Sequence, residues 1–144
     1  MFRRQEDGYA SPAAHMGKRL TVLVVDDSKV MRSIIRRILC AGGIEVLEAG
    51  DGRQALAVLA EHAVDCIISD WNMPRMPGID LLRRVRGDDG LADTPFVMLT
   101  AESLAANKAE ADAARVSSYL TKPFTAETLW GVLRAVLPDA VPTR

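Results

Sequence analysis

The stretch LTVLVVDD, residues 20–27, decides the fold class of this chain. Its first six residues are continuously apolar and rich in β-branched side chains, and Asp26 and Asp27 end the run. A short apolar run without polar alternation is typical of a strand buried on both faces, because helices cover both faces of a parallel sheet. The stretch therefore predicts one strand of a parallel sheet.

A helix is predicted directly after this strand, because the apolar spacing changes from Ser28 onwards. Gly42 and Gly43 are expected to end it. One face of this helix is marked by Met31, Ile34, Ile35, Ile38 and Leu39, and Arg32, Arg36 and Arg37 lie off that face. Residues 20–43 therefore form one strand-then-helix unit.

The same alternation recurs along the rest of the chain. Further strands are expected at 44–49, 64–69, 95–100 and 117–121, and further helices at about 51–60, 79–85, 102–114 and 125–137. Five strands alternating with five helices predict a doubly wound α/β fold with a parallel sheet and right-handed crossovers. We expect a flexible tail at 1–17, one domain at 18–138 and a short tail at 139–144.

The composition is that of an ordinary globular protein. The 144 residues are 49% hydrophobic and 26% charged, with a formal net charge of -1, which argues against a disordered chain or a protein that coats DNA. No apolar run is long enough to span a bilayer, so we expect no membrane association and a cytoplasmic location. Cys40 and Cys66 stand among apolar residues and are expected to be buried, reduced thiols.

Polar side chains follow four of the predicted strands at their carboxyl ends, where open α/β sheets bind ligands. Asp26 and Asp27 follow the first strand, Asp70 the third, Thr100 the fourth and Lys122 the fifth. Any one of these is explained by strand termination or helix capping. Together they predict a functional site.

Three carboxylates in one crevice repel each other, so either a pKa rises or a cation neutralises them. Oxygen ligands without Cys or His favour a hard ion such as Mg²⁺. Lys122 is the cation expected among the acids, where it could hold an oxygen of a phosphoryl group. The crevice is therefore predicted to hold Mg²⁺ and to accept phosphate.

The segments VVDDS (24–28), SDWNMP (69–74), LTAE (99–102) and YLTKPF (119–124) resemble the CheY-like receiver domain of bacterial response regulators. The resemblance covers residues 20–137 and implies the flavodoxin-like strand order 2-1-3-4-5. It implies a stand-alone signalling switch of two-component phosphorelays and chemotaxis, not an enzyme, with intrinsic self-phosphorylation and self-dephosphorylation. It also implies a histidine kinase or phosphotransfer protein as donor, a motor or kinase component as target, and a monomer that can dimerise when phosphorylated.

The resemblance also implies roles for the acids. Asp70 is the expected phosphoacceptor, and Asp27 and Asp70 are expected to bind Mg²⁺ directly. Asn72 is expected to contribute its backbone carbonyl, and Asp26 to act through a water molecule. Asn72 and Glu102 are expected to flank the path of the hydrolytic water.

The remaining roles concern the phosphoryl group and the switch. Lys122, Thr100 and Ala101 are expected to bind the phosphoryl group. Thr100 and Tyr119 are the expected switch pair, and Lys122-Pro123 is expected to be a cis peptide. Phosphorylation would thereby change the face made by the fourth and fifth helices and the fifth strand.

The partner surface is expected to include Trp130, Tyr119, Arg32 and Arg36. Trp130 falls on or near an outward strip of the last helix, where it either lies at the rim of the core or belongs to a docking patch. The two arginines either form a solvated face or meet the phosphodonor.

Two positions depart from the family pattern. Arg115 and Val116 replace a common Gly-Ala pair, which predicts an uncomfortable backbone there, and Pro77 replaces a common Asp and should stiffen its loop. Two alternative functions stay open: an aspartyl-nucleophile phosphatase, and a module that binds a nucleotide second messenger. The second would use arginines such as Arg75, Arg83, Arg84 and Arg86.

Overall fold

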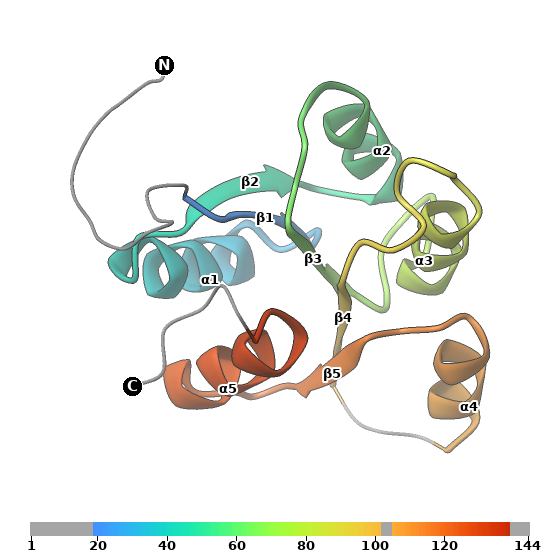
Figure 1. Cartoon of the computed structure of the whole chain (residues 1–144). Coiled ribbons are helices and arrows are strands. Elements are labelled where there is room, and N and C mark those ends of the chain that lie inside the picture. The colour runs from blue at the N-terminus through green and yellow to red at the C-terminus, as the bar shows by residue number, and fades with distance from the viewer. Residues whose placement is uncertain (1–18, 102–104, 139–144) are drawn as a thin grey trace.

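The computed structural model describes residues 19–101 and 105–138 (Figure 1). The strands are β1 (Thr21–Val25), β2 (Glu45–Ala49), β3 (Cys66–Asp70), β4 (Phe96–Thr100) and β5 (Ser118–Thr121). The helices are α1 (Lys29–Ala41), α2 (Gly52–Glu61), α3 (Gly78–Arg86), α4 (Ala105–Ala113) and α5 (Ala126–Val136). The tails predicted at 1–17 and 139–144 lie outside the described residues.

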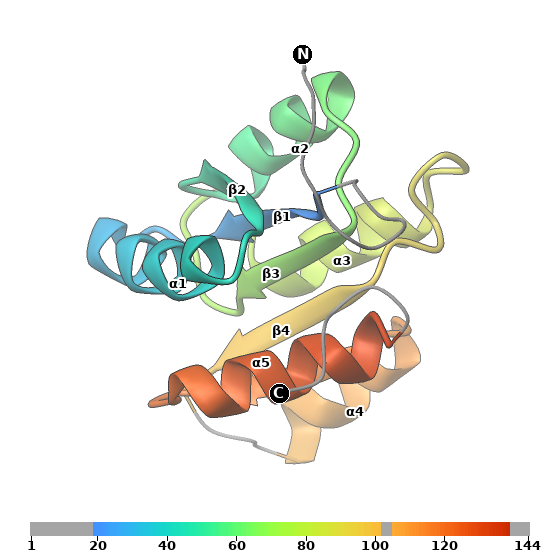
Figure 2. The same cartoon turned by 60° about the vertical axis from the view of Figure 1, so that its left-hand side comes forward.

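The strands form one parallel sheet in the order β2-β1-β3-β4-β5, so the predicted fold class and strand order are confirmed. Helices α1 and α5 cover one face, and α2, α3 and α4 cover the other (Figures 1 and 2). The order reverses between β1 and β3, which is where α/β sheets of this kind bind ligands.

Alternate residues of each strand enter two separate cores. On β1, Val22 and Val24 pack beneath α1 and α5, whereas Leu23 and Val25 pack beneath α2 and α3. All four side chains are fully buried. Burial on both faces explains why β1 has a continuous apolar sequence instead of an alternating one.

The start of α1 connects the fold to the crevice. Ser28 caps the helix, because its hydroxyl accepts a hydrogen bond of 3.1 Å from the amide of Met31. The amide of Ser28 donates in turn to Asp26 Oδ1 at 2.8 Å. One residue thus fixes both the helix terminus and the first acid of the site.

Two predictions of burial were wrong, and one alternative that the sequence left open is decided. Ile34 is 41% exposed, because Ile35 and Leu39 fill the core below α1 and Ile34 turns toward its outer edge. Cys40 is exposed and only Cys66 is buried, since Cys40 lies one residue beyond Leu39 and so faces solvent. Trp130 is half-buried against the α1–α5 core, next to Gly42, and therefore belongs to the rim of the core.

Several local predictions are confirmed. Arg115 has a φ of 66°, the left-handed region that favours glycine, as its place in the family pattern predicted. Lys122-Pro123 is a cis peptide. The helix predicted at 102–114 is described from Ala105, and 102–104 lie outside the described residues. Within the described residues, no helix is both long and apolar enough to cross a membrane.

Candidate functional site

Three carboxylates meet at the carboxyl ends of β1 and β3. Pairing of these strands aligns Val25 with Ser69, which brings the residues that follow each of them to the same edge of the sheet. Asp26, Asp27 and Asp70 each place one carboxylate oxygen within 4.8 Å of the others. The predicted convergence of the acids is therefore present in the folded chain.

Asp26 is the most deeply buried of the three acids, with 1% of its surface exposed. Its Oδ1 accepts the amide hydrogen of Ser28, but its Oδ2 is buried and has no hydrogen-bond partner among the described residues. Burial raises the pKa of Asp26; the hydrogen bond from Ser28 opposes this rise, and repulsion by Asp70 adds to it. A buried carboxylate oxygen without a partner is costly, which favours a cation or an ordered water beside it.

Asp70, at the end of β3, is 7% exposed and contacts the cationic group of the site. Its Oδ1 accepts the amide hydrogen of Trp71 at 2.9 Å and lies 3.3 Å from the Nζ of Lys122. Lys122 is held by its own amide, which donates to the carbonyl of Thr100 at 2.7 Å. The structure thus brings together the acid and the lysine that sequence reasoning paired.

Thr100 and Ala101 lie beside this pair at the end of β4, with Thr100 buried and Ala101 exposed. Glu102, the predicted neighbour of the hydrolytic water, lies outside the described residues. Tyr119 lies on β5 opposite Met98, and its hydroxyl donates to Asp112 on α4. In this conformation the side chain of Tyr119 is therefore hydrogen-bonded to α4.

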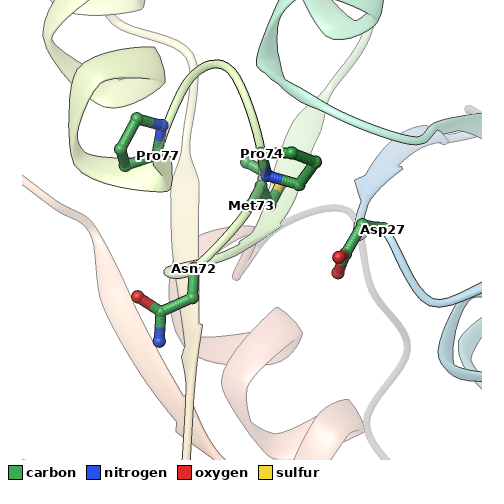
Figure 3. Close-up of a pocket in the computed structure, with 5 residues that line it drawn as sticks. All are labelled: Asp27, Asn72, Met73, Pro74 and Pro77. Atoms are coloured by element: carbon green, nitrogen blue, oxygen red, sulfur yellow. The ribbon is translucent and has the colours of Figure 1, made fainter.

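A pocket of about 410 Å³ opens beside the acids. Asp27 contributes from the β1 side, and the loop between β3 and α3 contributes the rest of the lining (Figure 3). The lining residues from this loop are Asn72, Met73, Pro74 and Pro77. The carboxylate of Asp27 is exposed, so a solute that enters the pocket meets an acidic group on one side and prolines on the other.

Arg32 supports the site through a contact with the backbone of Asp26, and the sequence did not predict this contact. Its Nη1 donates to the backbone carbonyl of Asp26 at 2.6 Å, and its Nε donates to Glu48 at 2.8 Å. Its side chain is only 18% exposed, so the prediction of a solvated or partner-facing Arg32 is corrected. The residue that could have indicated this contact is Glu48, because β1–β2 pairing places it opposite Val24, two residues before Asp26.

Arg36 shares the same acid and stays more accessible. Its Nε contacts Glu48 Oε2 at 2.6 Å, and 45% of its side chain is exposed. Burial alone would raise the pKa of Glu48, but the hydrogen bonds from Arg36 and Arg32 lower it. Glu48 is therefore held ionised between two guanidinium groups.

The arginines considered for a second messenger are mostly engaged within the chain. Arg75 pairs with Asp51, and Arg83 pairs with Asp80 and Glu110. Arg86 donates to the backbone carbonyls of Ala92, Thr94 and Arg115. These contacts disfavour the nucleotide alternative, because a ligand would have to displace them.

Residues 22–134 match the response regulator receiver domain family, and the chain belongs to this family. The members it resembles are of the CheY type, and its function is that of a response regulator in a two-component system. The chemotaxis protein CheY-3 of Vibrio cholerae is 43% identical over 117 residues, which are 81% of this chain and 90% of that protein. The chemotaxis protein CheY of Pseudomonas aeruginosa is 45% identical over 111 residues, 76% of this chain and 90% of that protein.

Solved structures show the same relationship. CheY4 of Vibrio cholerae superposes with a TM-score of 0.81 at 41% identity, covering 83% of this chain and all of that one. The receiver domain of a sensor histidine kinase from Pseudomonas aeruginosa gives a TM-score of 0.75 at 27% identity, covering 83% of this chain and 98% of that one. That structure has a magnesium ion coordinated in its active-site cleft. CheY-type receivers interact with histidine kinases and with downstream targets.

Proposed function

We propose that Asp70 accepts a phosphoryl group from a phosphohistidine of a kinase or phosphotransfer protein. The observation that supports this is the set of three carboxylates within 4.8 Å, with Lys122 3.3 Å from Asp70. A carboxylate oxygen of Asp70 attacks phosphorus, the phosphorus–nitrogen bond breaks, and its electron pair returns to the imidazole of the donor. The product is an acyl phosphate on Asp70.

The residues present suit Mg²⁺. All the donors are oxygens, and Asp26 Oδ2 is buried without a partner among the described residues, which matches a hard cation held partly through water. The carboxylates of Asp27 and Asp70 and the backbone carbonyl of Asn72 would hold the ion, with Asp26 acting through water. Bound there, Mg²⁺ supplies positive charge that offsets the carboxylates and the transferred phosphoryl oxygens.

Lys122 then has a defined task. Its ammonium group contacts Asp70 Oδ1 before transfer, and from this position it can contact an oxygen of the phosphoryl group after transfer. Thr100 and Ala101 lie at the end of the neighbouring strand, where they would contact the same oxygens. Asn72 and Glu102 would control the access of water and so the rate of self-dephosphorylation.

The output is proposed to pass through Tyr119 to the face made by α4, β5 and α5. A hydrogen bond from Thr100 to the phosphoryl group would draw the end of β4 inward and let Tyr119 leave Asp112. Because the relatives are chemotaxis proteins, we expect the partner to be a motor or kinase component of a chemotaxis system. Trp130, at the rim of the α1–α5 core, stays a candidate contact beside that surface, whereas Arg36, which pairs with Glu48 on β2 at the other edge of the sheet, stays a candidate contact for the phosphodonor.

The test uses a small phosphodonor. With Mg²⁺ and acetyl phosphate, the intact protein should gain the mass of one phosphoryl group, and Asp70→Asn should abolish the gain. Asp89→Asn removes an exposed carboxylate far along the chain and should leave the gain unchanged. The emission of Trp71, whose amide contacts Asp70, should change with both Mg²⁺ and phosphodonor. Phosphorylation of the Asp70→Asn variant would refute the assignment.

A further inference from the structure

The loop between β3 and α3, residues 71–77, carries much of the proposed metal site. It contains Asn72, whose backbone carbonyl is the expected ligand, and it lines the pocket opposite Asp27. A loop of this kind keeps a carbonyl in place only if other contacts hold its backbone. Two such contacts reach α2, which lies beside α3 in both views (Figures 1 and 2).

The first contact is an ion pair between Arg75 and Asp51. Arg75 Nη1 lies 2.8 Å from Asp51 Oδ2, and the side chain of Asp51 is only 5% exposed. The other oxygen of Asp51 accepts the amide hydrogen of Gln54 at 2.8 Å and caps α2. Asp51 therefore joins the start of α2 to the loop with one carboxylate, and both of its oxygens are used.

The second contact is the packing of Met76 on Gly52. A Cβ atom at Gly52 would lie 2.8 Å from the Cβ, Cγ and Sδ atoms of Met76, so only glycine leaves room for this side chain. The backbone of Arg75 itself has a φ of 69°, which is unfavourable for a residue with a side chain. Such a conformation persists where surrounding contacts determine it.

We propose that Arg75 is a positioning residue, which clamps loop 71–77 to the N-terminus of α2 through Asp51 and thereby presents the Asn72 carbonyl to the cation. This inference rests on the proposed function, because it concerns the same metal site. It also explains why Arg75, whose side chain is 62% exposed, pairs with Asp51, whose side chain is almost fully buried.

The direction in which Mg²⁺ affinity changes when Arg75 is removed distinguishes a positioning role from an effect of its positive charge alone. Removing a cationic side chain near an acidic pocket should strengthen Mg²⁺ binding, because repulsion of the ion falls. Loss of the clamp should weaken binding, because the carbonyl ligand is no longer held. Arg75→Gly is the suitable variant, since glycine accepts the positive φ and removes only the guanidinium and its stem.

The experiment is calorimetric titration of the full chain with MgCl₂. Arg75→Gly should weaken Mg²⁺ binding by roughly three- to tenfold, less than the effect typical of residues that contact a metal ligand directly. Asp51→Asn keeps an oxygen for the α2 cap and should give a similar loss of Mg²⁺ affinity. The double variant should bind Mg²⁺ no more weakly than the single variant with the lower affinity. Arg84→Ala removes an exposed arginine of α3 and should not weaken binding.

A second measurement does not depend on the metal. In the metal-free protein, amide hydrogen exchange of residues 71–77 should quicken in Arg75→Gly, while exchange in β1 and β3 stays as in the wild type. Unchanged or tighter Mg²⁺ binding by Arg75→Gly would overturn the inference and leave the proposed function standing. Absence of Mg²⁺ uptake by the wild type would overturn both.

Discussion

The hydroxyl of Tyr119 donates a hydrogen bond of 2.5 Å to Oδ1 of Asp112, seven residues earlier in the chain. The same hydroxyl lies 3.0 Å from the carbonyl oxygen of Lys108, and the Nζ of Lys108 lies 5.9 Å from the centre of the ring. A phenol has one proton, and a carboxylate is the stronger acceptor for it. Two residues of α4, Asp112 and Lys108, therefore contact the proposed switch residue.

This contact predicts how Tyr119 titrates. Burial raises the pKa of Tyr119, and the hydrogen bond and charge of Asp112 raise it further. Stability from the neutral phenol is thus present below its ordinary pKa of about 10 and is lost as pH rises through the higher folded value. Asp112→Ala should lower the pKa, as measured from phenolate absorbance, with Tyr119→Phe identifying the transition. An unchanged pKa would contradict this account.

The same bond predicts an effect on the switch. A hydrogen bond of this kind contributes on the order of 1 kcal/mol, so its loss should raise the inward population of Tyr119 about fivefold. Asp112→Ala should then need less acetyl phosphate for half-maximal change of Trp71 emission. Asp89→Ala serves as a control for the loss of one exposed carboxylate. A requirement equal to that of the wild type would rule out a restraining role for Asp112.

Gly78 should tolerate no side chain. A Cβ atom there would overlap the backbone carbonyl oxygen of Asp70, which cannot move without disturbing the proposed phosphoacceptor. Gly78→Ala should therefore destabilise the protein by about 1–3 kcal/mol in urea unfolding. Gly131→Ala in α5 is the matched control, because a Cβ there meets nothing within 4 Å and should stabilise by roughly 0.5–1 kcal/mol. Equal effects of the two substitutions would be inconsistent with this packing.

The ring of Trp130 covers Gly42 at the end of α1, where a Cβ atom would overlap Cη2 and Cζ2. Gly42→Ala should displace the ring and change its emission, measured in a Trp71→Phe background. Gly43→Ala is the matched control: its φ of 87° strains any side chain, yet a Cβ there meets nothing within 4 Å. It should cost about 1–2 kcal/mol and leave Trp130 emission unchanged. A reversed pattern would show that Trp130 lies elsewhere.

The two cysteines should differ in reactivity. Cys40 is exposed, whereas Cys66 is fully buried on β3, and burial raises the pKa of the Cys66 thiol to about 12. Only a thiolate reacts readily, so dithionitrobenzoate should label one thiol of the native protein near pH 8 and two after denaturation. Cys40→Ser should remove the native signal. Rapid labelling of that variant would mean that Cys66 is accessible.

Much of the site was predictable because strand ends can be recognised locally. Asp26, Asp27, Asp70, Thr100 and Lys122 each stand at the carboxyl end of a strand that the sequence predicts, and parallel strands bring such positions to one edge. The family resemblance added the strand order and the cis peptide before Pro123. The contacts made by side chains across the fold were not predictable in the same way.

Arg32 and Arg75 show the reason. Arg32 has the spacing of a solvated helix residue, yet its guanidinium reaches Glu48 on β2 and the backbone of Asp26. Arg75 lies in a loop without periodicity, and its partner Asp51 is 24 residues away. Periodicity assigns a residue to a face of its own element but does not say which acid on another element that face meets.

By itself, the sequence determined the alternation of strands and helices, the parallel sheet and the acids at its carboxyl edge, because apolar period and strand ends are local properties. Only the tertiary structure decided which oxygen of Asp26 has no partner among residues 19–101 and 105–138, which arginines support the crevice, and that Tyr119 is held on α4. Those outcomes depend on distances of a few ångströms between elements, which arise when the two cores pack and the strands take their register.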